Sequence, residues 1–294
     1  MLLAIPFPDL SPILFEFSLG PINLAIRWYA LAYIVGVIIG YWLIAQAMKR
    51  PTLWPNQTVA LTKKDLEDLL TWMILGIIIG GRLGYVLFYE RDYYLANPLD
   101  IPKVWMGGMA FHGGFLGSLT AAIIFSRRRS IPLLTLTDLL AMATPPGIML
   151  GRIANFINAE LWGRPTDAPW GVIFPGQAAQ TCPGVDGLCA RHPSQLYEAG
   201  LEGLVLGAAL LWLAFARGWL RKPGAIGGLF LAGYGAARFF VEFYRVADAQ
   251  FITPDSPAGR VLFIGDFGLS MGQLLSTPMI IGGLGLMIWA LRRP

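Results

Sequence analysis

The chain has 294 residues, of which 55% are hydrophobic and 14% are charged, and its formal net charge is +4 at pH 7. Soluble domains carry about 25% charged residues, so this composition excludes an ordinary soluble enzyme, a disordered chain, a collagen and a coiled coil. The basic residues lie in short clusters between long apolar stretches, which excludes a nucleic-acid-binding face and indicates a polytopic membrane protein.

Seven apolar stretches are long enough to cross the roughly 30 Å hydrocarbon core of a bilayer as helices. They are predicted at residues 23–47, 66–89, 104–126, 131–158, 194–216, 224–245 and 268–290. The fourth contains Pro145-Pro146-Gly147, which predicts a kink or a break there. The first basic residue is Arg27, so no charged segment precedes the first span, and we expect this span to be retained rather than cleaved. The predicted fold is a single all-α integral membrane domain over residues 1–294.

Glycines in several spans recur at a spacing of four residues, which lets transmembrane helices approach each other closely. The pairs are Gly36/Gly40, Gly76/Gly80, Gly113/Gly117, Gly147/Gly151 and Gly203/Gly207. We interpret them as packing positions.

Lysine and arginine alternate between the connections, and twelve of the 22 lie on one side of the predicted membrane. These twelve are Lys49, Arg50, Lys63, Lys64, Arg127, Arg128, Arg129, Arg217, Arg221, Lys222, Arg292 and Arg293. The opposite connections hold only Arg91, Lys103, Arg164, Arg191 and Arg260. The positive-inside rule therefore predicts that the N-terminus is outside and the C-terminus is cytoplasmic.

The loop over residues 159–193, between the fourth and fifth spans, is rich in proline and glycine and predicts a small extracytoplasmic cap. It contains the only two cysteines, Cys182 and Cys189. An oxidising compartment permits a disulfide between them. A metal site with His192 is the weaker alternative to a disulfide or free thiols, because two thiols and one imidazole make a poor cage. We expect no metal and no cofactor.

Ionisable residues inside a bilayer are costly and are candidates for function. Counted at 1.5 Å per residue from the outer end of each span, seven of them share one depth in the outer half. They are Arg82, His112, Arg152, Glu198, Glu202, Arg238 and Glu242. Arg238 and Glu242 could be a simple i,i+4 ion pair, but the convergence of five spans favours a site. With Arg245 near the rim, guanidinium groups outnumber carboxylates, so the predicted ligand is the phosphate of a phospholipid. Only Asp138 lies in the inner half.

His112 is the only histidine inside a span and lies in the run Phe111-His112-Gly113-Gly114. A lone histidine on an apolar helix is commonly a hydrogen-bonded structural residue. The arginines at matching depth favour a functional role, and the glycines leave space beside it for a substrate.

The strongest local pattern is GRIANFINAELWGR over residues 151–164, which resembles the signature of the bacterial prolipoprotein diacylglyceryl transferases. The resemblance extends to Trp28-Tyr29 and to residues 111–114, 191–198 and 234–245. Ala154 stands where many members carry glycine. The loops at 164–190 and 246–269 match less well, so no functional residue is carried over there.

The resemblance implies a seven-span enzyme of the bacterial inner membrane with its N-terminus outside and its active site near the outer leaflet. The implied reaction transfers the diacylglyceryl group of phosphatidylglycerol to the cysteine thiol of a lipobox in a prolipoprotein signal peptide, forming a thioether and releasing glycerol phosphate. The implied catalytic residues are His112, Arg152 and Arg238. The expected substrate-binding residues are Tyr29, Asn155, Glu160, Gly163, Tyr234, Glu242 and, from its position at the rim, Arg245.

The chemistry of this reaction suits these residues. A thiol with a pKa of about 8.5 is mostly protonated at neutral pH, so a neutral imidazole is a useful base. Guanidinium groups stabilise the charge that grows on the departing phosphate. The alternative is a transporter or channel for an anion or a lipid, with an arginine-lined cavity in the outer leaflet. Such a protein should carry polar residues through the full depth of the membrane. A receptor or scaffold would leave the histidine and arginines unexplained.

Overall fold

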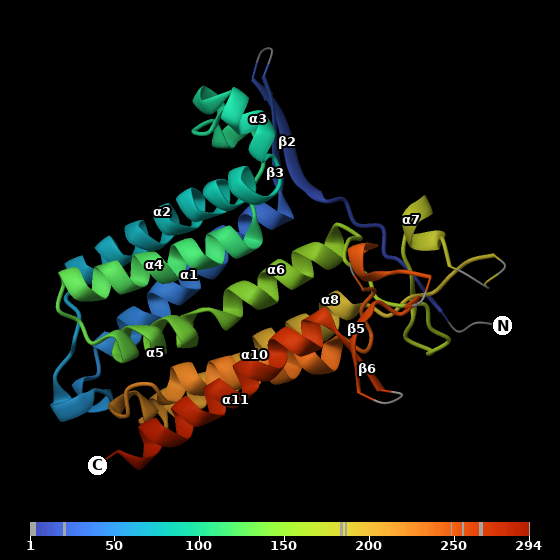
Figure 1. Ribbon diagram of the computed structural model, residues 1–294. Coiled ribbons are helices and arrows are strands. Elements are labelled where there is room, and N and C mark those ends of the chain that lie inside the picture. Colours follow the sequence, from blue (N-terminus) through green and yellow to red (C-terminus); the bar gives the residue numbers. More distant parts are fainter. Residues whose placement is uncertain are drawn as a thin grey trace.

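The computed structural model describes residues 4–19, 22–182, 185, 187–247, 249–254, 256–264 and 267–293. It is mostly helical, and the long helices run side by side as a bundle with a smaller irregular cap at one end (Figure 1). The long helices are α1 (Trp28–Met48), α2 (Lys63–Phe88), α4 (Phe111–Arg128), α5 (Leu133–Ala143), α6 (Pro145–Ile157), α9 (Leu206–Phe215), α10 (Ala225–Val241) and α11 (Met271–Arg292). The short ones are α3 (Arg91–Ala96), α7 (Gln177–Gln180) and α8 (Ser194–Glu198).

Five helical segments are long and apolar enough to cross a membrane, as judged by length and composition. They are Trp28–Met48, Lys63–Phe88, Leu133–Ile157, Ser194–Phe215 and Met271–Arg292. Helix α10 is apolar but has 17 residues, and α4 has 18 residues with two arginines in its last turn. The expectation of a membrane protein is therefore confirmed.

The chain is mostly helical, as predicted, and three two-stranded sheets lie in the connecting segments. Strands β2 (Ile13–Leu19) and β3 (Ile22–Arg27) pair antiparallel, as do β5 (Arg260–Ile264) and β6 (Phe267–Ser270). Strands β1 (Ile5–Pro6) and β4 (Val172–Ile173) pair in parallel. The first span begins at residue 28 rather than 23 because residues 22–27 pair with β2 as a strand instead of joining the helix.

The third span also begins later than predicted, at Phe111 rather than at residue 104. Gly107 and Gly108 have φ values of 84° and 80°, a conformation that interrupts a helix and that glycine adopts without strain. The predicted break in the fourth span is confirmed, because α5 ends at Ala143 and α6 begins at Pro145.

The fifth span contains a π-helical segment, Ala199–Val205, between α8 and α9. This segment carries Glu202 and packs closely on α6, since a Cβ at Gly203 would lie 2.4 Å from the Cβ of Met149. π-helical turns insert a residue into the helix and occur often at functional sites.

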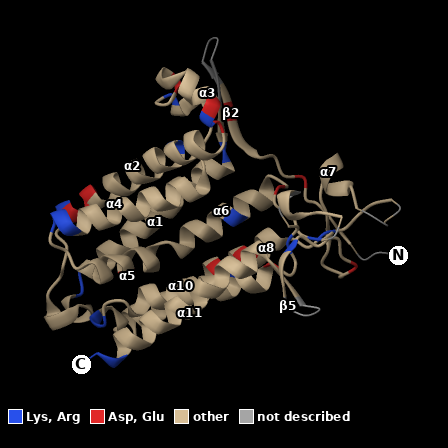
Figure 2. Ribbon diagram, viewed as in Figure 1, with Lys and Arg blue, Asp and Glu red and all other residues tan. Residues whose placement is uncertain are grey.

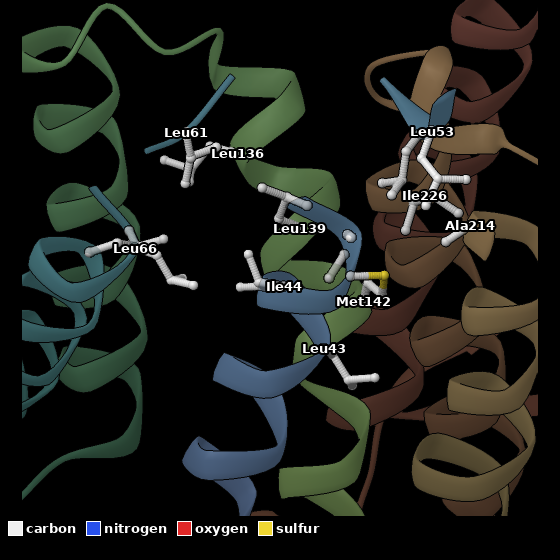
Figure 3. Close-up of a cluster of buried hydrophobic side chains, with 14 of the residues drawn as sticks. Leu43, Ile44, Leu53, Leu61, Leu66, Leu136, Leu139, Met142, Ala214 and Ile226 are labelled. Carbon is white, nitrogen blue, oxygen red and sulfur yellow. The ribbon is translucent and has the colours of Figure 1, made fainter. Parts of the chain in front are cut away.

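The apolar core fills the end of the bundle opposite the cap. Figure 3 shows side chains from α1, α5, α9 and α10 meeting there, including Ile44, Leu139, Met142 and Ile226. The connection between α1 and α2 closes this end, with Trp54 buried and its Nε1 donating to the carbonyl of Ala47 at 2.9 Å. This end of the protein is therefore packed with apolar side chains.

Most of the paired glycines are packing positions, as expected, but Gly151 is not, because a Cβ there would meet nothing within 4 Å. Helices α2 and α4 approach so closely that a Cβ at Gly117 would lie 2.0 Å from the carbonyl oxygen of Gly76. Between α1 and α6, a Cβ at Gly36 would lie 2.8 Å from the Cα of Gly147. These contacts fix the spacing of the helices.

We expect Gly117→Ala to destabilise the protein by about 1–3 kcal/mol, because the new methyl group forces two helix backbones apart. Gly282→Ala in α11 is the matched control, since a Cβ there meets nothing within 4 Å. Thermal unfolding in detergent measures both. Equal melting temperatures for the two variants would contradict the close α2–α4 contact.

Candidate functional site

Six charged side chains meet where α6, α8, the π-helical segment and the end of α10 come together. They are Arg152, Glu198, Glu202, Arg238, Glu242 and Arg245, and we call them the Arg–Glu cluster. Helices α6, α8 and α10 and the π-helical segment contain no other Lys, Arg, Asp or Glu, and Figure 2 shows few coloured segments along these helices. Five of the six were predicted from the sequence to share one depth, and Arg245 was predicted near the rim.

Glu198 is the centre of the cluster. Its Oε1 accepts hydrogen bonds from Nη1 of Arg238 and from Nη1 of Arg245, each at 2.8 Å. Its Oε2 lies 3.1 Å from Nε of Arg152. The side chain is fully buried, and these three guanidinium groups are the positive charges placed around it.

The other two carboxylates each hold one arginine. Glu242 Oε2 lies 2.8 Å from Nη2 of Arg238, and Glu202 Oε2 lies 3.9 Å from Nη2 of Arg152. The start of α11 leaves room for Glu242, because a Cβ at Gly272 would lie 2.4 Å from its Oε2. Arg238 therefore bridges two carboxylates through two different nitrogens.

The arginines are more accessible than the carboxylates. The side chains of Glu198 and Glu202 are 0% exposed, whereas those of Arg152 and Arg238 are each 22% exposed. Arg245 is 14% exposed, and its Nε has no acceptor among the described residues. The buried carboxylates thus hold three guanidinium groups whose remaining N–H donors can bind an anion.

Polar side chains hold the turn that follows α6, one pair from the turn region itself and one from α8. The Nδ2 of Asn155 donates to Oε1 of Glu160 at 2.8 Å, and the Nε2 of Gln195 donates to the Glu160 carbonyl at 2.5 Å. Ala159 and Leu161 adopt positive φ values of 54° and 58°, which gives this turn its shape. Asn155 and Glu160 therefore lie just beyond Arg152 in a rigid turn.

Gly163 allows the cap to contact the end of α10. A Cβ there would lie 2.4 Å from the carbonyl oxygen of Tyr244 and 2.8 Å from that of His192. The next residue, Arg164, donates from its backbone N–H to Tyr244 and from its Nε to the Arg245 carbonyl at 2.7 Å. Gly163 thus holds the backbone that carries Arg245.

Two tyrosines approach the cluster from other helices. Tyr29 on α1 and Tyr234 on α10 lie close enough to Arg152 to interact electrostatically with its guanidinium. The Tyr29 hydroxyl accepts a hydrogen bond from Tyr33 at 3.4 Å. Both tyrosines were expected at the site.

His112 lies outside the cluster. It is in the first turn of α4 with an exposed side chain, and its ring packs edge-on against Phe111 at 5.6 Å. Its side chain forms no hydrogen bond or ion pair within the described part of the chain. Figure 1 places this turn at the same end of the bundle as the C-terminal end of α6, which carries Arg152.

Arg82 was predicted to lie at the same depth as the other ionisable residues and to contribute to the anion site. It does not join the Arg–Glu cluster. Its buried guanidinium donates to five backbone carbonyls of the 100–108 segment, including those of Ile101 at 2.7 Å and Asp100 at 2.8 Å. The other acceptors are the carbonyls of Lys103, Gly107 and Gly108. Within the described residues the carbonyls of Ile101, Gly107 and Gly108 accept no backbone hydrogen bond, so Arg82 satisfies them and has a structural role.

Asp138, the buried carboxylate of the inner half, also has a structural partner. It accepts hydrogen bonds from the backbone N–H groups of Gly224 and Gly227, at 2.8 and 2.7 Å. These groups begin α10 and would otherwise be unsatisfied.

The cap is joined by a disulfide between Cys182 and Cys189, with Cα atoms 6.3 Å apart, so the disulfide alternative is the one the structure shows. Among the described residues, no group of three or more His, Cys, Asp and Glu side chains is placed to hold a metal.

His192 is a further residue whose setting sequence reasoning missed. Its Nδ1 lies 3.0 Å from the Tyr197 hydroxyl, which accepts from Nε1 of Trp170 at 2.8 Å, and its ring packs on Tyr244. Burial lowers the pKa of His192, so its imidazole is neutral at pH 7. The run over residues 191–198 was noticed in the sequence, but only the fold shows that it supports the turn and the cluster.

Comparisons with known proteins agree on one family. A family model described as prolipoprotein diacylglyceryl transferase matches residues 12–289. A protein of Ruegeria pomeroyi named phosphatidylglycerol–prolipoprotein diacylglyceryl transferase is 62% identical over 278 residues, covering 95% of this chain and 94% of its own. Proteins of the same name from Cereibacter sphaeroides and Sinorhizobium medicae are 61% and 45% identical, each covering 98% of this chain and 98% and 94% of their own lengths.

Proposed function

Because this chain belongs to the prolipoprotein diacylglyceryl transferase family, we propose that it transfers the diacylglyceryl group of phosphatidylglycerol to the lipobox cysteine of prolipoprotein signal peptides. The thiol sulfur attacks the glyceryl carbon, a thioether forms, the C–O bond to phosphate breaks and glycerol phosphate leaves. No cofactor is part of this proposal.

The observation that carries the proposal is the sharing of buried Glu198 by three arginines whose outer faces remain accessible. A phosphate diester carries one negative charge, and the departing phosphate monoester gains a second as the C–O bond breaks. Guanidinium groups already held in place stabilise this added charge without reorganising, which lowers the barrier. Arg152 and Arg238 would bind the phosphate, and Arg245, which shares Glu198 with them, would add its positive charge beside it.

The remaining predicted residues fall into two roles in this proposal. Tyr29, Asn155, Glu160 and Tyr234 would position the headgroup or the arginines, and Gly163 and Glu242 would hold Arg245 and Arg238. His112 would take the proton of the incoming thiol. Its exposed side chain on α4 suits a substrate that enters laterally from the membrane.

We also propose that α4 and α10 cross the membrane, giving seven spans with the N-terminus outside and the C-terminus in the cytoplasm. Lysine and arginine gather at the end of the bundle where α2 begins and where α4 and α11 end (Figure 2). The Arg–Glu cluster then faces the outer leaflet of the bacterial inner membrane.

Cysteine labelling tests this topology. Single cysteines introduced at 52–62 or 218–223 should be protected from an impermeant reagent in intact spheroplasts, and those at 165–175 should be labelled. The native Cys182 and Cys189 are joined as a disulfide and so do not compete. Protection of residues 165–175 would contradict the orientation.

An anion or lipid transporter is the alternative with arginines in a membrane cavity. The apolar core of Figure 3 fills the opposite end of the bundle, and Asp138 there is bound to two backbone amides. A transport path needs polar groups at this depth, so these residues favour transfer over transport.

Mass spectrometry distinguishes the two functions. Purified protein incubated with phosphatidylglycerol and a lipobox peptide should add one diacylglyceryl unit to the peptide, and a peptide with alanine in place of cysteine should gain nothing. Uptake of anions into proteoliposomes without any peptide modification would overturn the proposal in favour of transport.

A further inference from the structure

A pocket lies at the opposite end of the bundle from the Arg–Glu cluster, between α2 and α4. Its volume is about 410 Å³, and it is lined by Trp72, Phe125, Arg128 and Arg129. Trp72 and Phe125 pack against each other with ring centroids 6.4 Å apart. The pocket thus combines an aromatic wall with two cationic side chains, and the proposed reaction uses none of these residues.

The two arginines of the pocket differ in their partners. Arg129 is paired with Asp65, at 3.6 Å from Nε to Oδ1, and with Asp68. Arg128 has no carboxylate partner in the described part of the chain, and its guanidinium carbon lies 5.3 Å from the Trp72 ring centroid. A guanidinium beside an indole is attracted by the ring while its N–H donors remain available to an anion.

The surroundings of the pocket are typical of a membrane–water interface. Other arginines at this end also lie over aromatic rings: Arg50 over Phe215, Arg217 over Trp212 and Arg293 over Trp289. Such pairs are typical of the membrane–water interface, where aromatic rings and basic residues concentrate. From the pocket towards the middle of the bundle, α2 and α4 expose apolar side chains, which are Ile74, Leu75, Ile78, Leu119 and Ile124.

We propose that this pocket binds an anionic phospholipid, with its phosphate on Arg128 and its acyl chains along the exposed faces of α2 and α4. Arg128, which has no carboxylate partner among the described residues, favours an anion. The exposed apolar faces of α2 and α4 beside it favour a lipid over free phosphate. The proposal goes beyond the transferase activity. It depends on the proposed topology only in assigning the lipid to the cytoplasmic leaflet.

Native mass spectrometry of the full chain in detergent tests the site, with phosphatidylserine as an anionic lipid other than the proposed donor and phosphatidylcholine as the neutral reference. Arg128→Gln should weaken binding of one phosphatidylserine by at least about fivefold. Arg127→Gln is the matched control, because it removes the same charge from the adjacent residue without touching the pocket. It should keep wild-type binding. Arg128→Lys should lose less than Arg128→Gln and serves if the glutamine variant does not fold.

Equal phosphatidylserine binding by the Arg128→Gln and Arg127→Gln variants would overturn the proposal. So would an equal preference of the wild type for both lipids. Thermal stabilisation by inorganic phosphate alone that matches that of the lipid would assign the pocket to a free anion. Peptide modification is measured on the same samples, where loss of transfer in every sample would count against the proposed function and leave the lipid result standing.

Discussion

Arg238→Lys is expected to lower kcat/KM for diacylglyceryl transfer by about 10²–10³-fold, the usual effect of losing one fixed donor to a developing negative charge. Arg238 uses Nη1 for Glu198 and Nη2 for Glu242, both at 2.8 Å. A lysine has one nitrogen on a flexible stem and cannot hold both carboxylates while facing a phosphate. The positive charge is kept, so the buried glutamates are not left without a cation. Peptide mass gain over time measures the rate.

Arg221→Lys is the matched control, since it makes the same chemical change at the opposite end of the bundle, on an exposed side chain. It should retain wild-type transfer. Near-normal transfer by Arg238→Lys, with an unchanged melting temperature, would show that Arg238 serves only in a structural ion pair. Phosphate binding would then be assigned to Arg152 and Arg245.

His112→Gln should lower transfer by about 10²–10⁴-fold at pH 7, the contribution of a general base. A thiol with a pKa of about 8.5 ionises without help as the pH rises. The ratio of wild-type to variant rate should therefore narrow towards pH 9. If His112 only positioned the lipid, the ratio would stay constant with pH, and this result in a folded, lipid-binding variant would reject the base role.

The chain has one other histidine, which supplies the control. Burial lowers the pKa of His192, so its charge does not change between pH 7 and pH 9. His192→Gln removes the contact with the Tyr197 hydroxyl at 3.0 Å and disturbs the cap beside Arg245. The ratio of wild-type to His192→Gln transfer rate should therefore be the same at pH 7 and pH 9. If the ratio for His192→Gln fell towards pH 9 as much as the ratio for His112→Gln, the pH effect would not be evidence that His112 is the base.

Most of the Arg–Glu cluster could be predicted from the sequence, because depth in a membrane follows from counting residues along a helix. Arg152, Glu198 and Arg238 lie at matching depths, and the structure joins them directly. Arg82 lies at the same predicted depth but not in the cluster. A residue count gives height along the bundle and no information on which neighbouring helices face each other.

The other differences between the sequence predictions and the structure also arise from features that a residue count does not detect. The five carbonyls bound by Arg82 belong to a loop whose shape depends on two glycines with positive φ, which no helical periodicity indicates. The π-helical segment over residues 199–205 shifts the side-chain phase within the fifth span, and nothing in its composition marks it. His192 was visible in a recognised run, but its packing on Tyr244 and the hydrogen bond from Trp170 to its partner Tyr197 come from distant residues that only the fold brings together.

The pairing of β1 with β4 sets an order of events during biosynthesis. Ile5 pairs with Val172, so the N-terminal strand has no partner until a segment roughly 170 residues later has been made. At about 5–20 residues per second, this wait lasts roughly 10–30 s. In the proposed topology, the strand would remain unpaired while four spans insert and the cap is exported. The cap therefore closes only after more than half of the chain has left the ribosome.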